Sequence, residues 1–481
     1  ILLNGCGQKN KRMNVEVFET SASGNKHTKV EQFESGAPTS TIQLHPEEKF
    51  QKITGLGGSF TESSAYLLNQ LSPENRTKII EAYFGEDGAK YSLTRTHINS
   101  CDFSLGNYAY VTDEDMELST FSITEDKDDI IPMIKEAMEV SSDGFKIISS
   151  PWTAPPFMKD NNSWVGGRLL EAHYPTWALY FSKYIEAYHK EGIDIWGVTF
   201  ENEPLGNGNN WESMHYTPGE MVDFVQNHLG PQLEQDGHDI KILGYDQNRD
   251  ELKEWASAMY KSEESSKYFA GTAIHWYAST YKWFPEVLQE VHEMAPDKYI
   301  IESEGCVDAQ VPKWQDDAWY WSKEATDWGW TWAPEDKKAD HPKYVPVYRY
   351  ARDIIGCLNN WVDGWVDWNM VLDRQGGPNW FKNWCVAPVI VDPEEDEVYF
   401  TPLFYTMMHF SKHIRPGAIK IGVDSSDENL MVTAAKNPDG SIAVVVLNMT
   451  EESKGFELKL DHKSVSVSLQ GQALQTIIIP S

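Results

Sequence analysis

Basic residues are scarce in this chain, and their scarcity excludes several classes of partner. Lys and Arg together number 41 against 73 Asp and Glu, which gives a formal net charge of −32. A surface this acidic repels the phosphates of nucleic acids and the headgroups of anionic lipids. We therefore expect no nucleic-acid partner and favour an uncharged substrate.

Signatures of metal sites, nucleotide cofactors and membrane spans are also missing. The five cysteines form no C-x-x-C pair, and no H-x-H, H-E-x-x-H or calcium-loop spacing occurs. The dinucleotide fingerprint is absent as well. No run reaches the ~20 apolar residues that a membrane-spanning helix needs. We expect neither a metal nor an organic cofactor.

The first residues form the one apolar segment that suggests targeting. The chain opens "ILLNGCGQKNKR", an apolar run followed by a small residue, Cys6 and a lysine-rich stretch. This order is similar to the end of a bacterial lipoprotein signal. We expect residues 1–12 to be a signal remnant and tether lipidated at Cys6, on a monomer exported to the periplasm or the cell surface. A chance apolar start is the alternative, and membrane contact is expected only through this anchor.

Eight short apolar runs alternate with longer stretches of helical character. The stretch 175–192 begins with proline and places Trp177, Tyr180, Phe181 and Tyr184 at helical spacing. Eight strand–helix alternations predict a (β/α)8 barrel, with a doubly wound open sheet as the alternative. The predicted strand runs are 53–63, 91–104, 145–156, 195–204, 240–248, 269–278, 298–305 and 362–370.

The pattern of the sequence changes near residue 400, from alternating strands and helices to β-prone runs. Two β-prone runs joined by "NPDG" lie within 429–450, and further runs follow over 454–480. We predict a catalytic barrel over 51–410 and a C-terminal β-sandwich over 411–481. Strands within 13–50 are expected to join that side domain, because a lone hairpin is seldom stable.

Residues that can do chemistry stand where the predicted strands end, which is where barrel enzymes build their active sites. Two carboxylates among them, Glu203 and Glu304, end the fourth and seventh strands. Opposed carboxylates among aromatic side chains favour glycoside hydrolysis, in which one attacks carbon and the other transfers the proton. The strand-end residues are Asp102, Trp152, Asn202, Glu203, His275, Tyr277, Glu304 and Trp368.

Each of these residues has a simpler interpretation. A single glutamate at a strand end is more often a surface or ion-paired residue, and most of the 19 Trp pack in the core. Carboxylates with His275 also suit a metal ion, although no metal-binding spacing supports that alternative. Cys101 and Cys306 lie in apolar runs, where we expect buried free thiols.

Several motifs in order along the chain resemble those of glycoside hydrolase family 30, in its branch of glucosylceramidases and β-1,6-glucanases. The matching segments are "GLGGSFTESSA" (55–65), "SCDFS" (100–104), "SPWTAPPFMK" (150–159), "FENEP" (200–204), "HWY" (275–277), "SEGCVD" (303–308), "GWVDWNMVLDRQGGPNW" (364–380) and "APVIVD" (387–392).

The resemblance implies a role for each site residue. It makes Glu203 the acid/base and Glu304 the nucleophile of a retaining β-glycosidase. Arg95 would orient a carboxylate, and Glu201 would be a supporting residue paired with Arg95. The substrate-binding residues that it implies are Asp102, Trp152, Asn202, His275, Tyr277, Trp368 and Asn383.

Two segments depart from the lysosomal members of the family and bear on the substrate. Residues 205–216, "LGNGNNWESMHY", are shorter, whereas 313–344 are longer and Trp-rich. Both departures favour a soluble β-glucan with β-1,6 linkages over a lipid substrate. A glucosylceramidase is the alternative, and a carbohydrate-binding lipoprotein without catalysis is the alternative of another class. The six Trp of the longer segment, candidates for stacking a sugar or for packing the loop, are Trp314, Trp319, Trp321, Trp328, Trp330 and Trp332.

Overall fold

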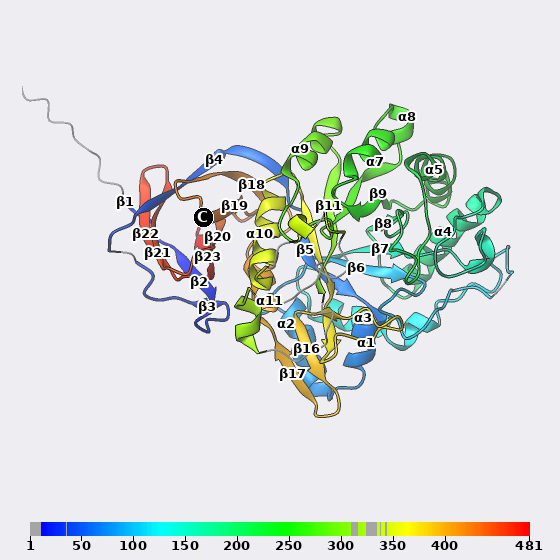
Figure 1. The fold of residues 1–481 in the computed structure, drawn as a ribbon, viewed down its shortest axis with the longest axis horizontal. Coiled ribbons are helices and arrows are strands. Elements are labelled where there is room, and N and C mark those ends of the chain that lie inside the picture. The colour runs from blue at the N-terminus through cyan, green and yellow to red at the C-terminus, as the bar shows by residue number, and fades with distance from the viewer. Residues whose placement is uncertain are drawn as a thin grey trace, which may run out of the picture.

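Eight parallel strands close into a barrel at the centre of the molecule (Figure 1). The computed structural model describes residues 11–34, 36–112, 114–308, 316–323, 334–336, 338–341 and 344–481. Every run predicted to be a barrel strand contains one, so the predicted barrel is confirmed. The strands are β5 (Gly55–Phe60), β6 (Leu93–Ile98), β7 (Lys146–Pro151), β8 (Gly197–Thr199), β9 (Lys241–Asn248), β10 (Phe269–His275), β11 (Tyr299–Gly305) and β13 (Gly364–Asn369).

Helices follow the strands and cover the outside of the barrel. The helix predicted over 175–192 is α4, which spans Tyr174–Lys190 and buries Trp177, Tyr180 and Phe181. The remaining helices are α1 (Glu62–Leu68), α2 (Pro73–Phe84), α3 (Ile130–Val140), α5 (Pro218–Phe224), α6 (Gly230–Gln235), α7 (Leu252–Met259), α8 (Glu263–Ser266), α9 (Pro285–Met294), α10 (Pro346–Leu358) and α11 (Pro402–Ser411). Short helical turns are η1 (Glu125–Asp128), η2 (Pro156–Met158), η3 (Glu171–His173), η4 (Val225–Leu229), η5 (Asp317–Trp321) and η6 (Lys338–Asp340).

The barrel interior is apolar in its lower part, and charged side chains lie nearer the carboxyl ends of the strands. Leu93, Ile148, Leu243 and Ile301 pack together within the barrel as one buried cluster. Side chains two residues apart on a strand share a face, so Arg95 follows Leu93 inward along β6. The polar side chains of the site, Arg95 among them, therefore lie on this packed apolar cluster, which fixes their position.

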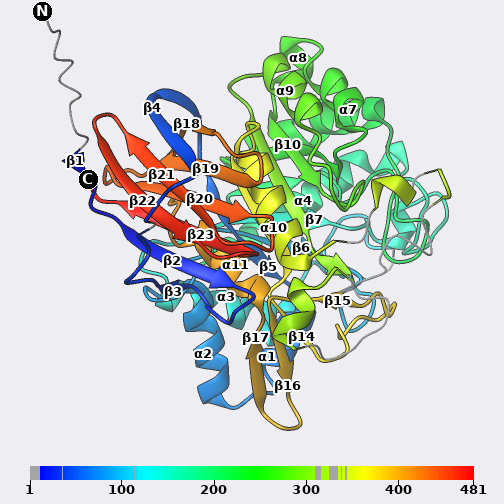
Figure 2. The same ribbon diagram turned by 60° about the vertical axis from the view of Figure 1, so that its left-hand side comes forward.

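A ten-stranded sheet forms the side domain, in the order β1-β22-β21-β4-β18-β19-β20-β23-β2-β3. Its N-terminal strands, blue in Figure 2, lie beside the red C-terminal strands, as predicted for the two ends of the chain. The sheet encloses a hydrophobic core of its own, and the "NPDG" segment turns between β19 and β20. The strands are β1 (Lys11–Arg12), β2 (Glu16–Ser21), β3 (Thr28–Lys29), β4 (Ser40–Lys52), β18 (Ile419–Ser425), β19 (Leu430–Lys436), β20 (Ile442–Asn448), β21 (Lys454–Leu460), β22 (Lys463–Leu469) and β23 (Ala473–Ile479).

Helix α11 joins the two domains through a buried histidine. The Nδ1 atom of His409 lies 2.8 Å from Thr476 Oγ1, and its Nε2 atom lies 2.8 Å from Thr20 Oγ1. One residue of the barrel is thereby hydrogen-bonded to strands from both ends of the chain. This contact ties the N-terminal and C-terminal strands to the barrel.

Two small sheets form within the loops that follow β11 and β13. β12 (Val307–Asp308) pairs with β15 (Cys385–Val386), which brings the segment after β11 to the segment after β13. A second sheet contains β14 (Val371–Asp373), β16 (Val389–Asp392) and β17 (Glu397–Phe400).

No helix in the described part of the chain combines the length and apolarity needed to cross a membrane. Cys6 lies outside the described residues, so its lipidation, the export of the chain and its monomeric state stay predictions.

Candidate active site

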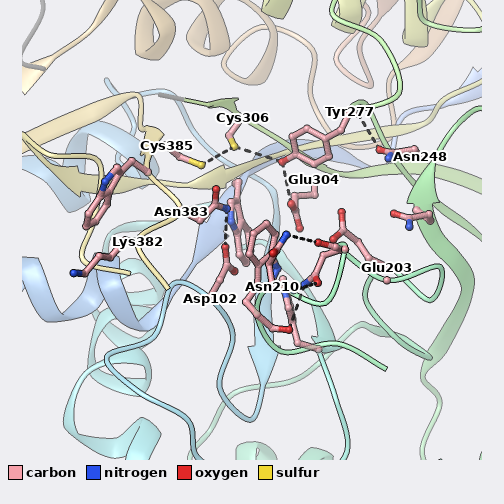
Figure 3. Close-up of a pocket in the computed structure, with 18 residues that line it drawn as sticks. Asp102, Glu203, Asn210, Asn248, Tyr277, Glu304, Cys306, Lys382, Asn383 and Cys385 are labelled. Carbon is pink, nitrogen blue, oxygen red and sulfur yellow. Dashed lines mark hydrogen bonds between the residues drawn. The ribbon is translucent and has the colours of Figure 1, made fainter. Parts of the chain in front are cut away.

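A cavity of about 910 Å³ opens at the carboxyl ends of the barrel strands (Figure 3). Four of the predicted site residues, Asn202, His275, Arg95 and Glu201, lie behind its wall at 0–2% exposure. The predicted residues that line it are Asp102, Trp152, Glu203, Tyr277, Glu304, Trp368 and Asn383.

The carboxylates of Glu203, four residues after the end of β8, and Glu304, near the end of β11, meet in this cavity. One carboxylate oxygen of Glu203 lies within 4.8 Å of one carboxylate oxygen of Glu304, and both side chains border the same space (Figure 3). Retaining glycosidases place their carboxyl groups about 5–5.5 Å apart, whereas inverting enzymes leave about 6.5–9.5 Å for a water molecule. The spacing therefore fits attack by a carboxylate rather than by water.

Glu203 sits on a turn that directs its carboxyl group into the cavity. Its backbone is left-handed, with φ of 51°, a conformation that is uncommon outside glycine and concentrates at functional sites. Its amide N–H donates to the Asp246 carbonyl at 3.0 Å, and its own carbonyl accepts from Gly206 at 2.7 Å. Neighbouring backbone thus holds this turn in place from both sides.

The charge environment of Glu203 suits a proton donor. Burial raises the pKa of its carboxyl group, the hydrogen bond with His275 opposes that shift, and the negative charge of Glu304 adds to it. A general acid must still carry its proton near the working pH. Burial and the charge of Glu304 both favour this protonated form of Glu203.

Glu304 is held by hydrogen bonds to both carboxylate oxygens. Arg95 Nη1 donates to Oε2 at 2.6 Å, and the Tyr277 hydroxyl donates to Oε1 at 2.9 Å. The side chain is only 7% exposed. An oriented, charge-paired carboxylate of this kind is suited to attack on an anomeric carbon.

Arg95 is the centre of the polar layer, but Glu201 is not its partner. Its fully buried guanidinium donates to Glu304, to Asn202 Oδ1 at 2.8 Å and to Asp246 Oδ2 at 2.8 Å. The predicted pairing of Arg95 with Glu201 is therefore corrected, because the guanidinium faces the barrel interior. The bond to Oδ1 orients Asn202 so that its amide nitrogen is the remaining donor.

Glu201 faces away from the cavity into the protein interior. It is fully buried, and its carboxyl oxygens have no hydrogen-bond partner among the described residues. Burial raises its pKa well above the usual range, and the charge of Lys159 opposes this only in part. Burial thus favours the uncharged form of Glu201, which is unsuited to the role of nucleophile.

The resemblance implied that His275 binds substrate, but His275 does not line the cavity and instead supports Glu203. It is fully buried, with Nδ1 at 3.4 Å from Glu203 Oε1 and Nε2 at 3.0 Å from Asp246 Oδ1. Burial alone would lower the pKa of His275. The carboxylates of Glu304, Asp246 and Glu203 outweigh burial and raise the pKa to about 10, so the ring is a cation beside the acid/base.

Asp246 is the site residue that the sequence analysis missed. It lies on β9 in the left-handed region, with φ of 60°, and binds Arg95, His275 and the Ser303 hydroxyl at 2.6 Å. Burial would raise the pKa of Asp246, but Arg95 and His275 outweigh it and hold the pKa far below its usual range. A charged residue within the apolar run "IKILGYDQN" was the available signal.

Aromatic rings and an acid shape the floor of the cavity. Trp152 and Trp368 stack with centroids 5.1 Å apart and an interplanar angle of 18°, and the Arg95 guanidinium lies 4.8 Å from the Trp152 ring centroid. Asp102 accepts from Asn383 Nδ2 at 3.2 Å. Burial, and next the charge of Glu304, raise the pKa of Asp102 well above its usual range. Flat apolar faces beside a polar group match the two sides of a pyranose ring.

Comparison with known proteins agrees with this geometry. The model of the glycosyl hydrolase family 30 TIM-barrel domain matches residues 53–414, and that of the family 30 beta sandwich domain matches residues 417–477. The chain belongs to glycosyl hydrolase family 30. It is therefore an enzyme, a glycoside hydrolase, and its two domains are those of the family.

Individual family 30 relatives differ in their stated substrates. The mouse lysosomal acid glucosylceramidase is 35% identical over 85% of this chain and 78% of its own length. The endo-1,6-beta-D-glucanase of Neurospora crassa is 28% identical over 85% of this chain and 80% of its own. The solved endo-beta1,6-glucanase BT3312 is 28% identical, superposes with a TM-score of 0.82, and matches over 97% of this chain and 100% of its own.

The cysteines of this family 30 enzyme include a close pair in the cavity wall. Cys101, Cys306, Cys357 and Cys385 are buried and form no disulfide, as expected for Cys101 and Cys306. The Cys306 and Cys385 sulfur atoms lie 3.3 Å apart.

Only part of the Trp-rich segment can be placed. Trp319 and Trp321 belong to η5 and do not line the cavity; Trp321 is 7% exposed and packs in the core. The other four tryptophans of this segment, Trp314, Trp328, Trp330 and Trp332, lie outside the described residues.

The chemistry of Glu203, His275 and Glu304 bears on whether the site could hold a metal ion. Glu203, His275 and Glu304 lie close enough together to hold an ion. A metal-binding histidine must be neutral, yet the pKa of His275 is raised to about 10. The three residues therefore suit proton transfer better than metal binding.

Proposed function

We propose that this enzyme hydrolyses β-1,6-glucosidic bonds of a β-glucan with retention of configuration. The observation that carries the mechanism is the close approach of the Glu203 and Glu304 carboxylates. In the first step Glu304 attacks the anomeric carbon as the glycosidic C–O bond breaks. Glu203 gives its proton to the departing oxygen, and a glucosyl ester of Glu304 forms.

In the second step the same residues work in reverse. Glu203, now ionised, takes a proton from water, and the resulting oxygen attacks the anomeric carbon. The ester bond to Glu304 breaks and the β-anomer is released. Arg95 and Tyr277 hold the Glu304 oxygens in place, while the His275 cation stabilises Glu203 in its ionised form.

The β-1,6 linkage is supported by relatives and by loops. Both a curated relative and a solved structure named as β-1,6-glucanases span most of the chain. The loop after Glu203 adds the polar side chains of Asn207 and Asn210 to the cavity wall, with Trp211 beside them. Polar and aromatic groups in this position suit a sugar leaving group better than an alkyl chain.

Glucosylceramide is the second candidate substrate. It is favoured by the 35% identity with the mouse lysosomal acid glucosylceramidase. Product analysis on β-1,6-glucan, branched β-1,3/1,6-glucan and glucosylceramide under the same conditions separates the two. Release of glucose oligomers from the 1,6-linked glucan is expected, with the β-anomer detected first by NMR. Activity on the ceramide alone would overturn the glucan proposal.

A further inference from the structure

The cavity extends beyond the residues that would bind the sugar being cleaved. Its volume of about 910 Å³ lies near the upper end of the ~300–1,000 Å³ typical of small-molecule sites. Asp102, Trp152 and Trp368 form one part of the lining, around the carboxylates. A second part comes from segments 206–211 and 382–385, and none of its side chains takes part in the two chemical steps described above.

This second part lies next to Glu203, the residue that would protonate the departing oxygen. Segment 206–211 begins three residues after Glu203, whose carboxyl group protonates the departing oxygen. The Gly206 amide N–H donates a hydrogen bond to the Glu203 carbonyl at 2.7 Å. We therefore expect the group attached to that oxygen to lie beside this segment.

Trp211 gives the segment an aromatic face. It is half-buried, lines the cavity and packs against the apolar cluster that contains Trp152 and Trp368. The Phe381 ring meets it edge-on, with centroids 5.7 Å apart and an interplanar angle of 62°. Phe381 is itself 40% exposed, so the two rings together present apolar surface at the cavity rim.

A buried glutamate fixes this wall before any ligand arrives. Glu212 Oε2 accepts from Trp380 Nε1 at 2.9 Å, while its Oε1 accepts from the Ser100 hydroxyl at 2.8 Å and from Asn107 Nδ2 at 2.6 Å. These bonds join the loops after β6, β8 and β14 at one point. Trp211 and Phe381 flank the bonded pair in sequence, so their rings are held in place.

Polar donors border the same face. Asn207 Nδ2 bonds the Trp211 and Glu212 carbonyls and holds the loop closed. Asn210 and Lys382 are exposed, line the cavity and can donate to hydroxyl groups. An aromatic plane rimmed by donors matches a pyranose ring, which has apolar faces and hydroxyl groups around its edge.

We propose that Trp211, buttressed by Phe381, stacks the glucose unit on the leaving-group side of the scissile bond. The inference rests on the proposed action on a β-glucan and identifies the site for its second sugar. Substrates without a leaving-group sugar gain nothing from this site, which distinguishes it from a general role in folding or catalysis.

The test compares β-glucosyl fluoride, whose leaving group is a single atom, with β-1,6-glucan. Trp211→Ala is expected to lower kcat/KM on the glucan about tenfold, the size of one aromatic contact, and to leave the fluoride rate unchanged. Trp211→Phe should restore part of the loss, and Phe381→Ala should cause a smaller loss on the glucan alone. Phe50→Ala removes a ring of the same 40% exposure on β4 and should change neither rate.

The possible outcomes distinguish a failure of the Trp211 stacking site from a failure of the proposed β-glucan substrate. Equal losses on the fluoride and the glucan, or no loss on the glucan, would overturn the stacking site while leaving glucan hydrolysis intact. A wild-type enzyme that hydrolyses the fluoride but no β-glucan would overturn the proposed substrate and the site together.

Discussion

Arg95 Nη1 lies 2.6 Å from Glu304 Oε2, inside a barrel where Arg95 has no exposure to solvent. The same guanidinium also binds Asp246 and Asn202. A buried charge is tolerable only when it is paired and hydrogen-bonded. The arginine thus fixes the nucleophile and Asn202 in a single geometry, which is the preorganisation that catalysis requires.

Replacing each carboxylate should separate the two halves of the reaction. Glu203→Gln is expected to lower the rate on β-1,6-glucan by about 10²–10⁴-fold, because general acid catalysis is lost. On 2,4-dinitrophenyl β-glucoside, which needs no proton donor, the glucosyl ester should form and accumulate. Azide should then restore turnover and give β-glucosyl azide.

Glu304→Gln should abolish hydrolysis of both substrates, and azide should not produce the β-azide. Mass spectrometry of the intact enzyme checks for the ester in each variant. An ester formed by Glu304→Gln, or none formed by Glu203→Gln with the activated substrate, would contradict the assignment of roles.

Glu201→Gln is the matched control for its neighbour Glu203. Burial raises the pKa of Glu201 well above its usual range and so favours its uncharged form, which glutamine resembles in charge and shape. Activity at pH 7 should therefore stay within about twofold of wild type, given that a tenfold change requires 1.36 kcal/mol. A loss as large as that of Glu203→Gln would show that Glu201 takes part in the chemistry.

The sequence pattern alone could not distinguish the roles of Glu201 and Glu203. Side-chain alternation could not decide between them, and only the family resemblance selected Glu203. The structure supplies the physical reason, since β8 ends at Thr199 and the left-handed turn at Glu203 points it into the cavity. Backbone turns of this kind at a non-glycine residue leave no clear pattern in a sequence.

The strands were predictable because each is a short apolar run that ends in polar residues. Asp246 was missed for the same reason, because it lies inside the run of β9 rather than after it. Its partners Arg95 and His275 are on β6 and β10, and only barrel closure brings the three together. Likewise, the burial of His275 depends on packing that no local pattern describes.

The pH profile should report the charge of His275. Glu203 works as an acid while protonated, so activity falls as the pH rises through its pKa. Burial raises that pKa and the His275 hydrogen bond lowers it, so His275→Gln should raise it further and move the alkaline limb of kcat/KM to higher pH. The profile on β-glucosyl fluoride is the control. A lower rate with an unmoved limb would mean that His275 only fills space.

Asp246→Asn should disturb the site without touching substrate. The substitution removes the charge that Arg95 and His275 share, so Arg95 would no longer be held between Asp246 and Glu304. A displacement of about 1 Å can cost on the order of 10²-fold in rate, and we expect a fall of this size in kcat with less change in KM. Ser303→Ala, which removes a neutral partner of Asp246, should have a much smaller effect. Equal effects of the two changes would contradict a positioning role for the charge.

Acid should weaken the junction between the two domains. His27, His409 and His413 lie together there, with Lys412 and Arg415 nearby, and His27 Nε2 is 2.8 Å from His413 Nε2. Burial and the Lys412 charge lower the pKa of His27 to about 4, and burial lowers the pKa values of His409 and His413 well below the usual range.

Because these folded-state pKa values are depressed, the unfolded chain binds more protons, and stability is lost as pH falls below about 6.5. His27 alone should reduce the free energy of unfolding by about 2 kcal/mol between pH 8 and pH 5. His27→Asn keeps a residue that tolerates the φ of 51° at this position and should flatten the dependence by that amount. Chemical denaturation at pH 8, 6.5 and 5 measures it, and an identical slope for the variant and the wild type would show that His27 is already charged in the folded protein.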